Sequence, residues 1–122
     1  MKLILDSDPR VNLVRRYEPG AIQVGEQVLR APFILSADRL EPLWPVQSLG
    51  QLSEADLAPL LALQPQIVLL GGAAADPGRV LPLRRQLGQR GVALEVMELG
   101  AACRTYNILA QEARRVVAGL FP

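Results

Sequence analysis

The spacing of hydrophobic and polar positions changes halfway along the chain. In the first half, short β-favouring runs stand between Pro and Gly breaks, and they predict strands at 3–5, 13–17, 21–24, 27–29 and 33–36. Gly25 and Glu26 separate two of these runs, and Gly followed by a polar residue suits a type II′ turn. We therefore expect a hairpin here. The proline-rich stretch 41–45 is expected to be an ordered loop, because proline cannot donate a backbone hydrogen bond.

In the second half, helical spacing alternates with continuous apolar runs. Ser53 offers a capping hydroxyl and Asp56 a carboxylate three residues later, which predicts a short helix. Apolar runs at 67–70 and 92–97 predict strands covered on both faces. Between these runs, Pro82 suits the first position of a helix that runs to about Gln89, and Gly91 suits its left-handed end.

A final helix is expected from about residue 101 to residue 120. Its apolar positions fall on one stripe, which should pack on the sheet. The stripe consists of Ala102, Tyr106, Leu109, Ala113, Val116 and Leu120.

Together these elements predict an α/β fold of three layers. We expect a central mixed sheet with a βαβα C-terminal half flanked by helices, and a small N-terminal β-hairpin layer. A strand–helix–strand unit makes its two strands parallel, so the loops after Leu70 and after Met97 should lie at the same edge of the sheet. Residues 1–122 are expected to form a single domain, because this length suffices for one hydrophobic core.

Composition restricts the partners and the compartment. The net charge is +1 and no run of Lys or Arg exceeds a pair, so nucleic acid is not an expected partner. The longest apolar run, 67–75, is too short to cross a bilayer, and the first residues lack the apolar core of a secretory signal. We therefore expect no membrane attachment. A cytoplasmic location is predicted, and the single cysteine fits a reducing compartment.

Histidine is absent from the chain, which excludes several kinds of catalytic site. Ser-His-Asp triads, Cys-His dyads and zinc sites that use histidine all require an imidazole. The sequence also offers no metal site and no recognisable cofactor motif. It therefore favours a protein without enzymatic activity, without a metal and without a cofactor.

Any ligand of such a fold is expected outside the carboxyl ends of its parallel strands. The residues expected at that edge are Gly71, Gly72, Asp76, Glu98, Gly100, Cys103, Arg104 and Asn107. The diglycine is not a phosphate-binding loop, because neither a third glycine nor Gly-Lys-Ser/Thr follows it. A tight turn is the other interpretation of these two glycines.

The start of the last helix carries the candidate chemistry. Residues 99–102 include no Ser, Thr, Asp or Asn, so its first N–H groups are expected to meet water, a neighbouring loop or an anion held with Arg104. The helix dipole and Arg104 would lower the pKa of Cys103. Cys103 and Arg104 are therefore the candidate catalytic residues. The alternative for Cys103 is a buried packing residue.

Glu95 is the polar exception in the apolar run 92–97. Alternation places it on a face that a helix should cover, so it should need a partner. Arg104 and Arg114 are the expected partners, in an ion pair that fixes the last helix to the sheet.

One segment resembles a known family. Residues 91–109 read Gly-Val-Ala-Leu-Glu-Val-Met-Glu-Leu-Gly-Ala-Ala-Cys-Arg-Thr-Tyr-Asn-Ile-Leu. This segment resembles domain-of-unknown-function family 498, which includes mitochondrial NADH dehydrogenase (complex I) assembly factor 3. The resemblance implies a three-layer fold and no established enzymatic activity. The family's Met-Asp-Thr-Gly is here residues 97–100, Met-Glu-Leu-Gly, and its Gly-Thr-Gly is here residues 71–73, Gly-Gly-Ala, so two hydroxyl groups are missing.

These observations favour a non-catalytic module that binds another protein, similar to an assembly factor, as a monomer or a weak homodimer. The alternative is a domain for a small anionic ligand, or a thiol-dependent enzyme, with its site at the C-terminal edge of the parallel strands.

Overall fold

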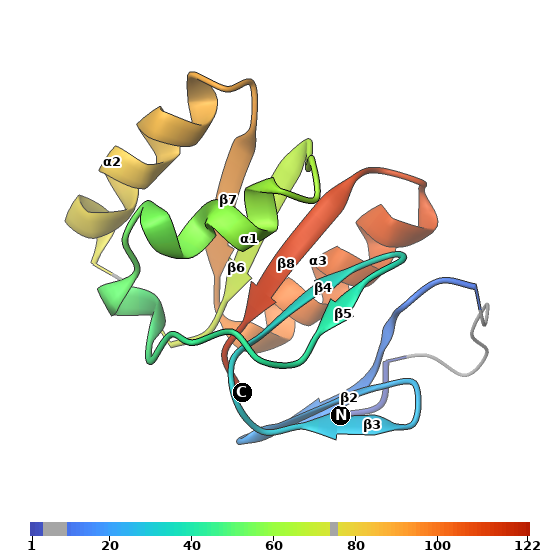
Figure 1. Cartoon of the computed structure of the whole chain (residues 1–122). Coiled ribbons are helices and arrows are strands. Elements are labelled where there is room, and N and C mark those ends of the chain that lie inside the picture. Colours follow the sequence, from blue (N-terminus) through green and yellow to red (C-terminus); the bar gives the residue numbers. More distant parts are fainter. Residues whose placement is uncertain (4–9, 74–75) are drawn as a thin grey trace.

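The larger of two sheets forms the middle layer of the molecule. The computed structural model describes residues 1–3, 10–73 and 76–122. The five strands of this sheet are β4 (Phe33–Ser36), β5 (Leu40–Glu41), β6 (Ile67–Gly71), β7 (Ala93–Met97) and β8 (Val116–Leu120). Their order is β5-β4-β8-β6-β7 (Figure 1). Strand β6 runs parallel to both β7 and β8, whereas β4 runs antiparallel to β5 and β8, so the sheet is mixed as expected.

The smaller sheet is an antiparallel meander near the N-terminus. It consists of β1 (Val14–Glu18), β2 (Ala21–Val24) and β3 (Gln27–Leu29). Gly25 has a φ of 58° in the turn between β2 and β3, which confirms the predicted hairpin. The layer has three strands rather than two, and Lys2 adds a single bridge to Arg16. Residues 4 and 5 of the strand predicted at 3–5 lie outside the described residues.

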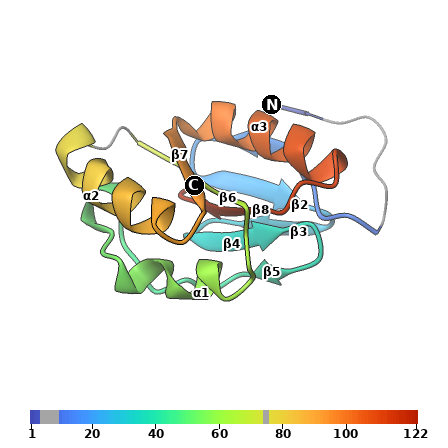
Figure 2. The same ribbon diagram turned by 90° about the horizontal axis from the view of Figure 1, so that it is seen from above.

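Helices cover both faces of the larger sheet (Figure 2). They are α1 (Ala58–Leu61), α2 (Pro77–Gly88) and α3 (Leu99–Gln111), and α1 is preceded by the 3-10 turns η1 (Leu49–Gln51) and η2 (Ala55–Leu57). Helices α1 and α2 pack on one face, and α3 packs on the other face together with the small sheet (Figures 1 and 2). The predicted three-layer arrangement is therefore confirmed. No helix within the described segments is long and apolar enough to cross a membrane.

The prediction of one long final helix was wrong. Helix α3 ends at Gln111, Ala113 has a φ of 60°, and the chain returns as β8 in the middle of the sheet. Val116 and Leu120 are therefore buried as strand residues and not as part of a helical stripe. The five-residue apolar run 116–120 suits a strand that is covered on both faces. Burial of the whole run decides the structure here, although the spacing of its residues also fits a helix.

The predicted start of α2 at Pro82 was also wrong. The Asp76 side chain accepts a hydrogen bond of 2.9 Å from the Gly78 backbone N–H and caps the helix, and Pro77 occupies its first turn. Pro82 lies inside the helix. The backbone N–H that proline lacks would have bonded the carbonyl of Gly78, which is exposed and so can meet water instead.

The open edge strand β7 explains a third difference. Glu95 is exposed, so the prediction that it is buried and needs an arginine partner was wrong. Helix α3 packs against Leu69 of β6 and Ala118 of β8, and on β7 it contacts Met97 at the end of the strand. Glu95, earlier on the same face of β7, is left uncovered. A carboxylate at this position stays hydrated.

Candidate functional site

The two loops predicted to meet at the carboxyl ends of the parallel strands do meet. Gly71 pairs with Met97 in the β6–β7 ladder, and the Gly72 N–H donates to the Met97 carbonyl at 3.2 Å. A Cβ atom added to Gly71 would overlap the Cβ of Ala102 on α3, and it would lie 3.1 Å from Leu120 Cδ2. The geometric prediction is confirmed, but the two elements touch directly. Glycine at this position serves close packing of the helix on the strand.

The amino end of α3 is capped by the chain itself. Glu98 is the N-cap residue, and its Oε1 accepts a hydrogen bond of 2.7 Å from the Ala101 N–H. The prediction of an uncapped helix start was therefore wrong. The Glu98 carboxylate thus lies at the positive end of the α3 dipole, where a bound anion was one of the expected partners.

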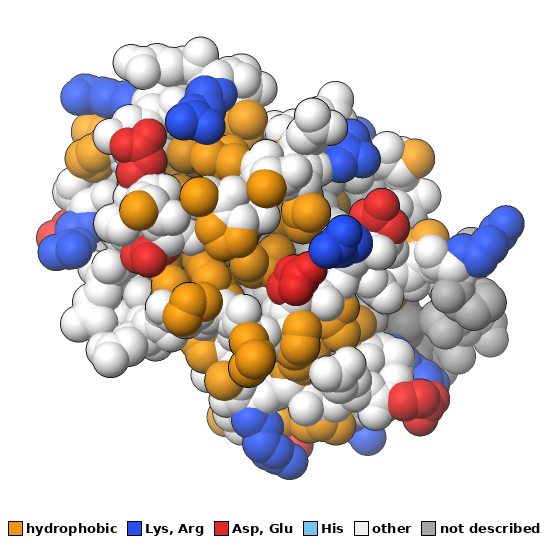
Figure 3. Space-filling view, viewed as in Figure 1, with side chains coloured by type: hydrophobic (Ala, Val, Ile, Leu, Met, Phe, Trp, Pro, Cys, Tyr) orange, Lys and Arg blue, Asp and Glu red, His pale blue; other side chains and the backbone are white. Residues whose placement is uncertain are grey.

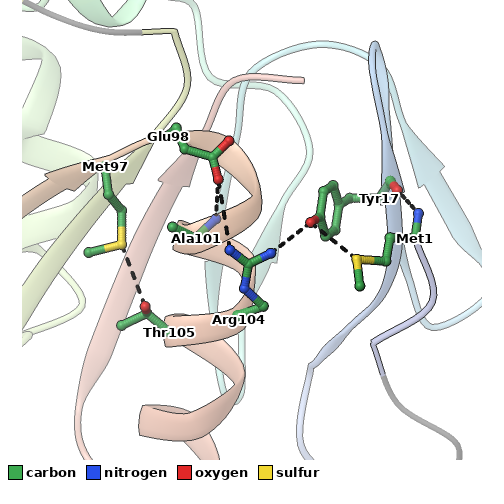
Figure 4. A network of polar contacts seen from close by, with 7 residues as sticks. All are labelled: Met1, Tyr17, Met97, Glu98, Ala101, Arg104 and Thr105. Carbon is green, nitrogen blue, oxygen red and sulfur yellow. Dashed lines mark hydrogen bonds and ion pairs between the residues drawn. The ribbon is translucent and has the colours of Figure 1, made fainter.

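Arg104 joins the start of α3 to the small sheet (Figure 4). Its Nη1 donates to the hydroxyl of Tyr17 at 2.8 Å, and its Nη2 lies 4.0 Å from Glu98 Oε1. Gly100 leaves room for this contact, because an added Cβ would lie 2.5 Å from the Tyr17 hydroxyl. The N-terminal amine of Met1 donates to the backbone carbonyl of the same Tyr17. The guanidinium thus has partners within the chain, and the groups around it are exposed.

Cys103 is part of the core. Its side chain is fully buried in the cluster that joins α3 to both sheets. Burial raises the pKa of the Cys103 thiol to about 12, and nearby Arg104 only partly offsets this effect. The predicted lowering of this pKa was wrong, because desolvation outweighs the helix dipole and the arginine. At neutral pH the thiol is protonated and shielded, which are the properties of a packing residue.

Asn107 provides hydrogen-bond partners for the backbone of Val14 in β1. Its Oδ1 accepts from the Val14 N–H at 2.9 Å and its Nδ2 donates to the Val14 carbonyl at 2.8 Å, and both contacts are buried. Tyr106, the preceding residue, donates its hydroxyl to the Asn12 carbonyl at 2.8 Å. These bonds satisfy backbone groups that would otherwise be buried without partners. The two side chains attach β1 to α3, a structural role that sequence reasoning missed.

The open space at this edge of the sheet lies on the α2 side. A groove of about 310 Å³ runs between α2 and the end of β7. Its lining residues are Ala73, Pro77, Val80, Arg84, Val96, Met97 and Glu98. Of the residues predicted for a site, only Glu98 lines this groove. The groove exists because β7 is an edge strand. The sequence does not indicate this, because a continuous apolar run such as 92–97 is typical of a strand that is covered on both faces.

The predicted site residues thus fall into two groups. Gly71, Gly72 and Gly100 allow close packing, and Cys103 and Asn107 lie in the interior. Glu98 and Arg104 remain partly exposed. No group of three or more Cys, Asp or Glu side chains gathers as a metal site in residues 1–3, 10–73 and 76–122. Asp76 caps α2. A ligand role for the eight predicted residues stays a prediction.

Comparison with protein families gives one match that covers most of the chain. The sequence model of a family described as "Protein of unknown function (DUF498/DUF598)" matches residues 14–121. The bovine (Bos taurus) protein named NADH dehydrogenase [ubiquinone] 1 alpha subcomplex assembly factor 3 is 30% identical over 93% of this chain and 67% of its own length. The protein of the same name from Danio rerio is 37% identical over 65% of this chain, which spans only 47% of that relative.

Solved structures of similar proteins share the fold. An NMR structure of a Xanthomonas campestris protein is 37% identical, covers 98% of this chain and 92% of its own, and superposes with a TM-score of 0.78. A Bordetella pertussis protein described as a Mth938-like domain is 29% identical, with coverage of 100% and 92% and a TM-score of 0.74. The two-sheet arrangement of this chain is therefore that of Mth938-like domains.

Proposed function

This chain belongs to the DUF498/DUF598 family of proteins of unknown function, and from that premise we propose that it is a non-catalytic module that binds another protein, in the manner of an assembly factor. The proposal is supported by relatives that are named assembly factors. We extend to this chain only the general property that such a name implies, which is a protein partner.

The observation that carries the proposal is the burial of Cys103. It is the one strong nucleophile in the sequence, and its side chain lies in the core with its pKa raised to about 12. The polar residues near it, Glu98 and Arg104, are engaged by the Ala101 N–H and the Tyr17 hydroxyl. This arrangement supports a surface for binding more than a centre for covalent chemistry.

Affinity purification from the native cell, followed by mass spectrometry for proteins and for small molecules, tests the proposal. We expect one protein, or a small set, to be recovered in stoichiometric amount with the tagged chain and not with an unrelated tagged protein of similar size. Recovery of a small molecule without any protein would overturn the proposal.

A direct assay separates the alternative of a small anionic ligand. Inorganic phosphate is added to the isotope-labelled protein while the backbone amides of residues 100–104 are followed by NMR. We expect no saturable shift, because the Glu98 carboxylate caps this helix start. Saturable shifts confined to these amides would favour the anion-binding alternative.

A further inference from the structure

Strand β7 presents unused backbone hydrogen-bonding groups at the edge of the larger sheet. The Ala93 N–H donates to the Gln66 carbonyl at 3.0 Å, and the Met97 carbonyl accepts from the Gly72 N–H at 3.2 Å. In a parallel ladder alternate residues bond the neighbouring strand, so residues 93, 95 and 97 bond β6. The backbone groups of Leu94 and Val96 therefore point away from the sheet.

Only part of this outer edge is covered. Arg84 reaches from α2 and donates its Nε to the Leu94 carbonyl at 3.1 Å, which protects the first half of the strand. Further along, the N–H and the carbonyl of Val96 have no hydrogen-bond partner in the part of the chain that the structure describes. An unpaired donor and acceptor on one residue of an edge strand match the backbone of another extended chain.

The groove between α2 and β7 lies beside these open groups. Pro77 and Val80 line it from α2, and Val96 and Met97 line it from β7. Figure 3 shows hydrophobic side chains exposed on the face of the molecule that carries α1 and α2. The groove thus offers apolar contact for a side chain of an added strand, in addition to the main-chain bonds of Val96.

Charges of opposite sign lie at the two ends of the groove. Arg84 lines one end, near Leu94, and its guanidinium forms no ion pair with any acidic side chain among the described residues. Glu98 lines the other end, with its side chain 71% exposed. A peptide antiparallel to β7 would place its C-terminal end at Arg84 and its preceding residues near Glu98. The free carboxylate of a chain terminus suits the guanidinium.

We propose that this groove binds the extended C-terminal tail of a partner protein, antiparallel to β7, with backbone hydrogen bonds to Val96 and the terminal carboxylate on Arg84. The inference rests on the proposed protein-binding function and specifies the partner's binding segment. A second copy of this chain fits less well. Helix α2 extends beyond β7 on its outer side (Figures 1 and 2), so two copies paired antiparallel through β7 would bring both α2 helices to the same face and the same place.

A peptide titration followed by NMR tests the site. The probe is an eight-residue peptide of two lysines followed by alternating threonine and valine, ending in a free carboxylate, and its control is the same peptide with an amidated end. We expect saturable shifts at the amides of residues 80–84 and 94–98, and about tenfold weaker binding of the amidated peptide. Shifts elsewhere only, no shifts, or equal binding of the two peptides would overturn the proposal.

Two pairs of variants locate the contacts. Val96→Pro removes the outward N–H without touching the β6 ladder, whereas Val96→Thr keeps both the N–H and the branched shape. We expect the first to weaken peptide binding at least about tenfold and the second to change it less than about threefold.

The second pair of variants tests the carboxylate contact. Arg84→Gln should weaken binding of the carboxylate peptide about tenfold and binding of the amidated peptide little. Arg85→Gln, on the same helix outside the groove, should change the binding of neither peptide. If Val96→Pro fails to fold, the arginine pair alone decides, and equal binding by Arg84→Gln and Arg85→Gln overturns the proposal.

Partner recovery separates this inference from the proposed function. The tagged wild-type chain and the folded Arg84→Gln variant are purified in parallel from the native cell. A partner whose recovery falls about tenfold with the variant, together with the peptide result, supports the groove. A partner recovered equally with both overturns the groove while protein binding stands, and absence of any partner from both overturns the proposed function itself.

Discussion

The two sides of the carboxyl ends of β6 and β7 differ in how they are filled. On the α3 side, Gly71 lies directly against Ala102, and Cys103 is fully buried. On the α2 side, a groove of about 310 Å³ remains between Val80 and Val96. Both sides belong to the edge where parallel sheets bind ligands. Sheet topology thus determines at which edge a ligand could bind, and the size of the side chains at that edge determines which part of it stays open.

The strongest test of the packed side is Gly71→Ala. The added methyl would overlap Ala102 Cβ and press on Leu120. Relieving the overlap would require α3 to move away from β6, which a closely packed core resists. We expect a loss of about 3 kcal/mol in the free energy of unfolding, measured by chemical denaturation. Gly88→Ala is the matched control, because its Cβ would meet open space at the end of α2, and it should change stability by less than about 1 kcal/mol.

A second variant shows whether the overlap causes that loss. Ala102→Gly in the Gly71→Ala background removes the opposing methyl, so it should recover part of the lost stability despite the cost of about 1 kcal/mol for glycine within a helix. A Gly71→Ala protein as stable as wild type would show that the α3 side has free space.

The attachment of the small sheet to α3 is tested by Asn107→Leu. Leucine has a similar volume but leaves the Val14 N–H and carbonyl buried without partners. We expect a loss of about 2 kcal/mol, together with faster hydrogen exchange at the Val14 amide. Gln111→Ala, at an exposed position of the same helix, should stay within about 0.5 kcal/mol. If both variants have wild-type stability, the buried amide pair does not hold the small sheet.

The buried thiol predicts a specific pH dependence. Its pKa is raised to about 12 in the folded protein, whereas an unfolded cysteine titrates near pH 8.5, so its contribution to stability is complete below that pH. As the pH rises further, only the unfolded state loses the proton, and stability falls. Between pH 8 and pH 10, wild type should lose about 1 to 2 kcal/mol more than Cys103→Ala, measured by urea denaturation at each pH. Parallel pH profiles for the two proteins would contradict the assignment.

The smallest expected effect concerns Glu98, which lies at the border of the two sides. Glu98→Ala removes the acceptor for the Ala101 N–H, and we expect a loss of about 1 kcal/mol in thermal or chemical unfolding. Glu95→Ala on the exposed face of β7 serves as the control and should change stability by less than about 0.5 kcal/mol. Equal effects of the two substitutions would mean that Glu98 does not act as a cap.

Much of the fold could be predicted because local signals agree with the final structure. Gly25 marks the hairpin turn, and the runs at 67–70 and 92–97 become the parallel pair β6 and β7. Strand β8 could not be recognised, because Ala113, Val116 and Leu120 also fit helical spacing and the break between α3 and β8 has no Gly or Pro. The positive φ of Ala113 is imposed by the surrounding structure, and an alanine in the sequence does not indicate a left-handed backbone conformation.

The candidate site was less predictable because it depends on contacts between distant segments. The juxtaposition of Gly71 with the start of α3 follows from topology and was foreseen. Burial of Cys103 depends on the small sheet, which packs on α3 from the other end of the chain. The cap by Glu98 was missed because glutamate is uncommon at this helix position.

Alkylation of Cys103 by iodoacetamide tests most directly whether the α3 side is packed interior. The reaction is followed by mass spectrometry at pH 7.5, with the native protein compared with the protein in denaturant. A fully buried thiol with a pKa of about 12 predicts a native rate at least about a hundredfold below the denatured rate. A native rate equal to or above the denatured rate would show an accessible thiolate and contradict the account.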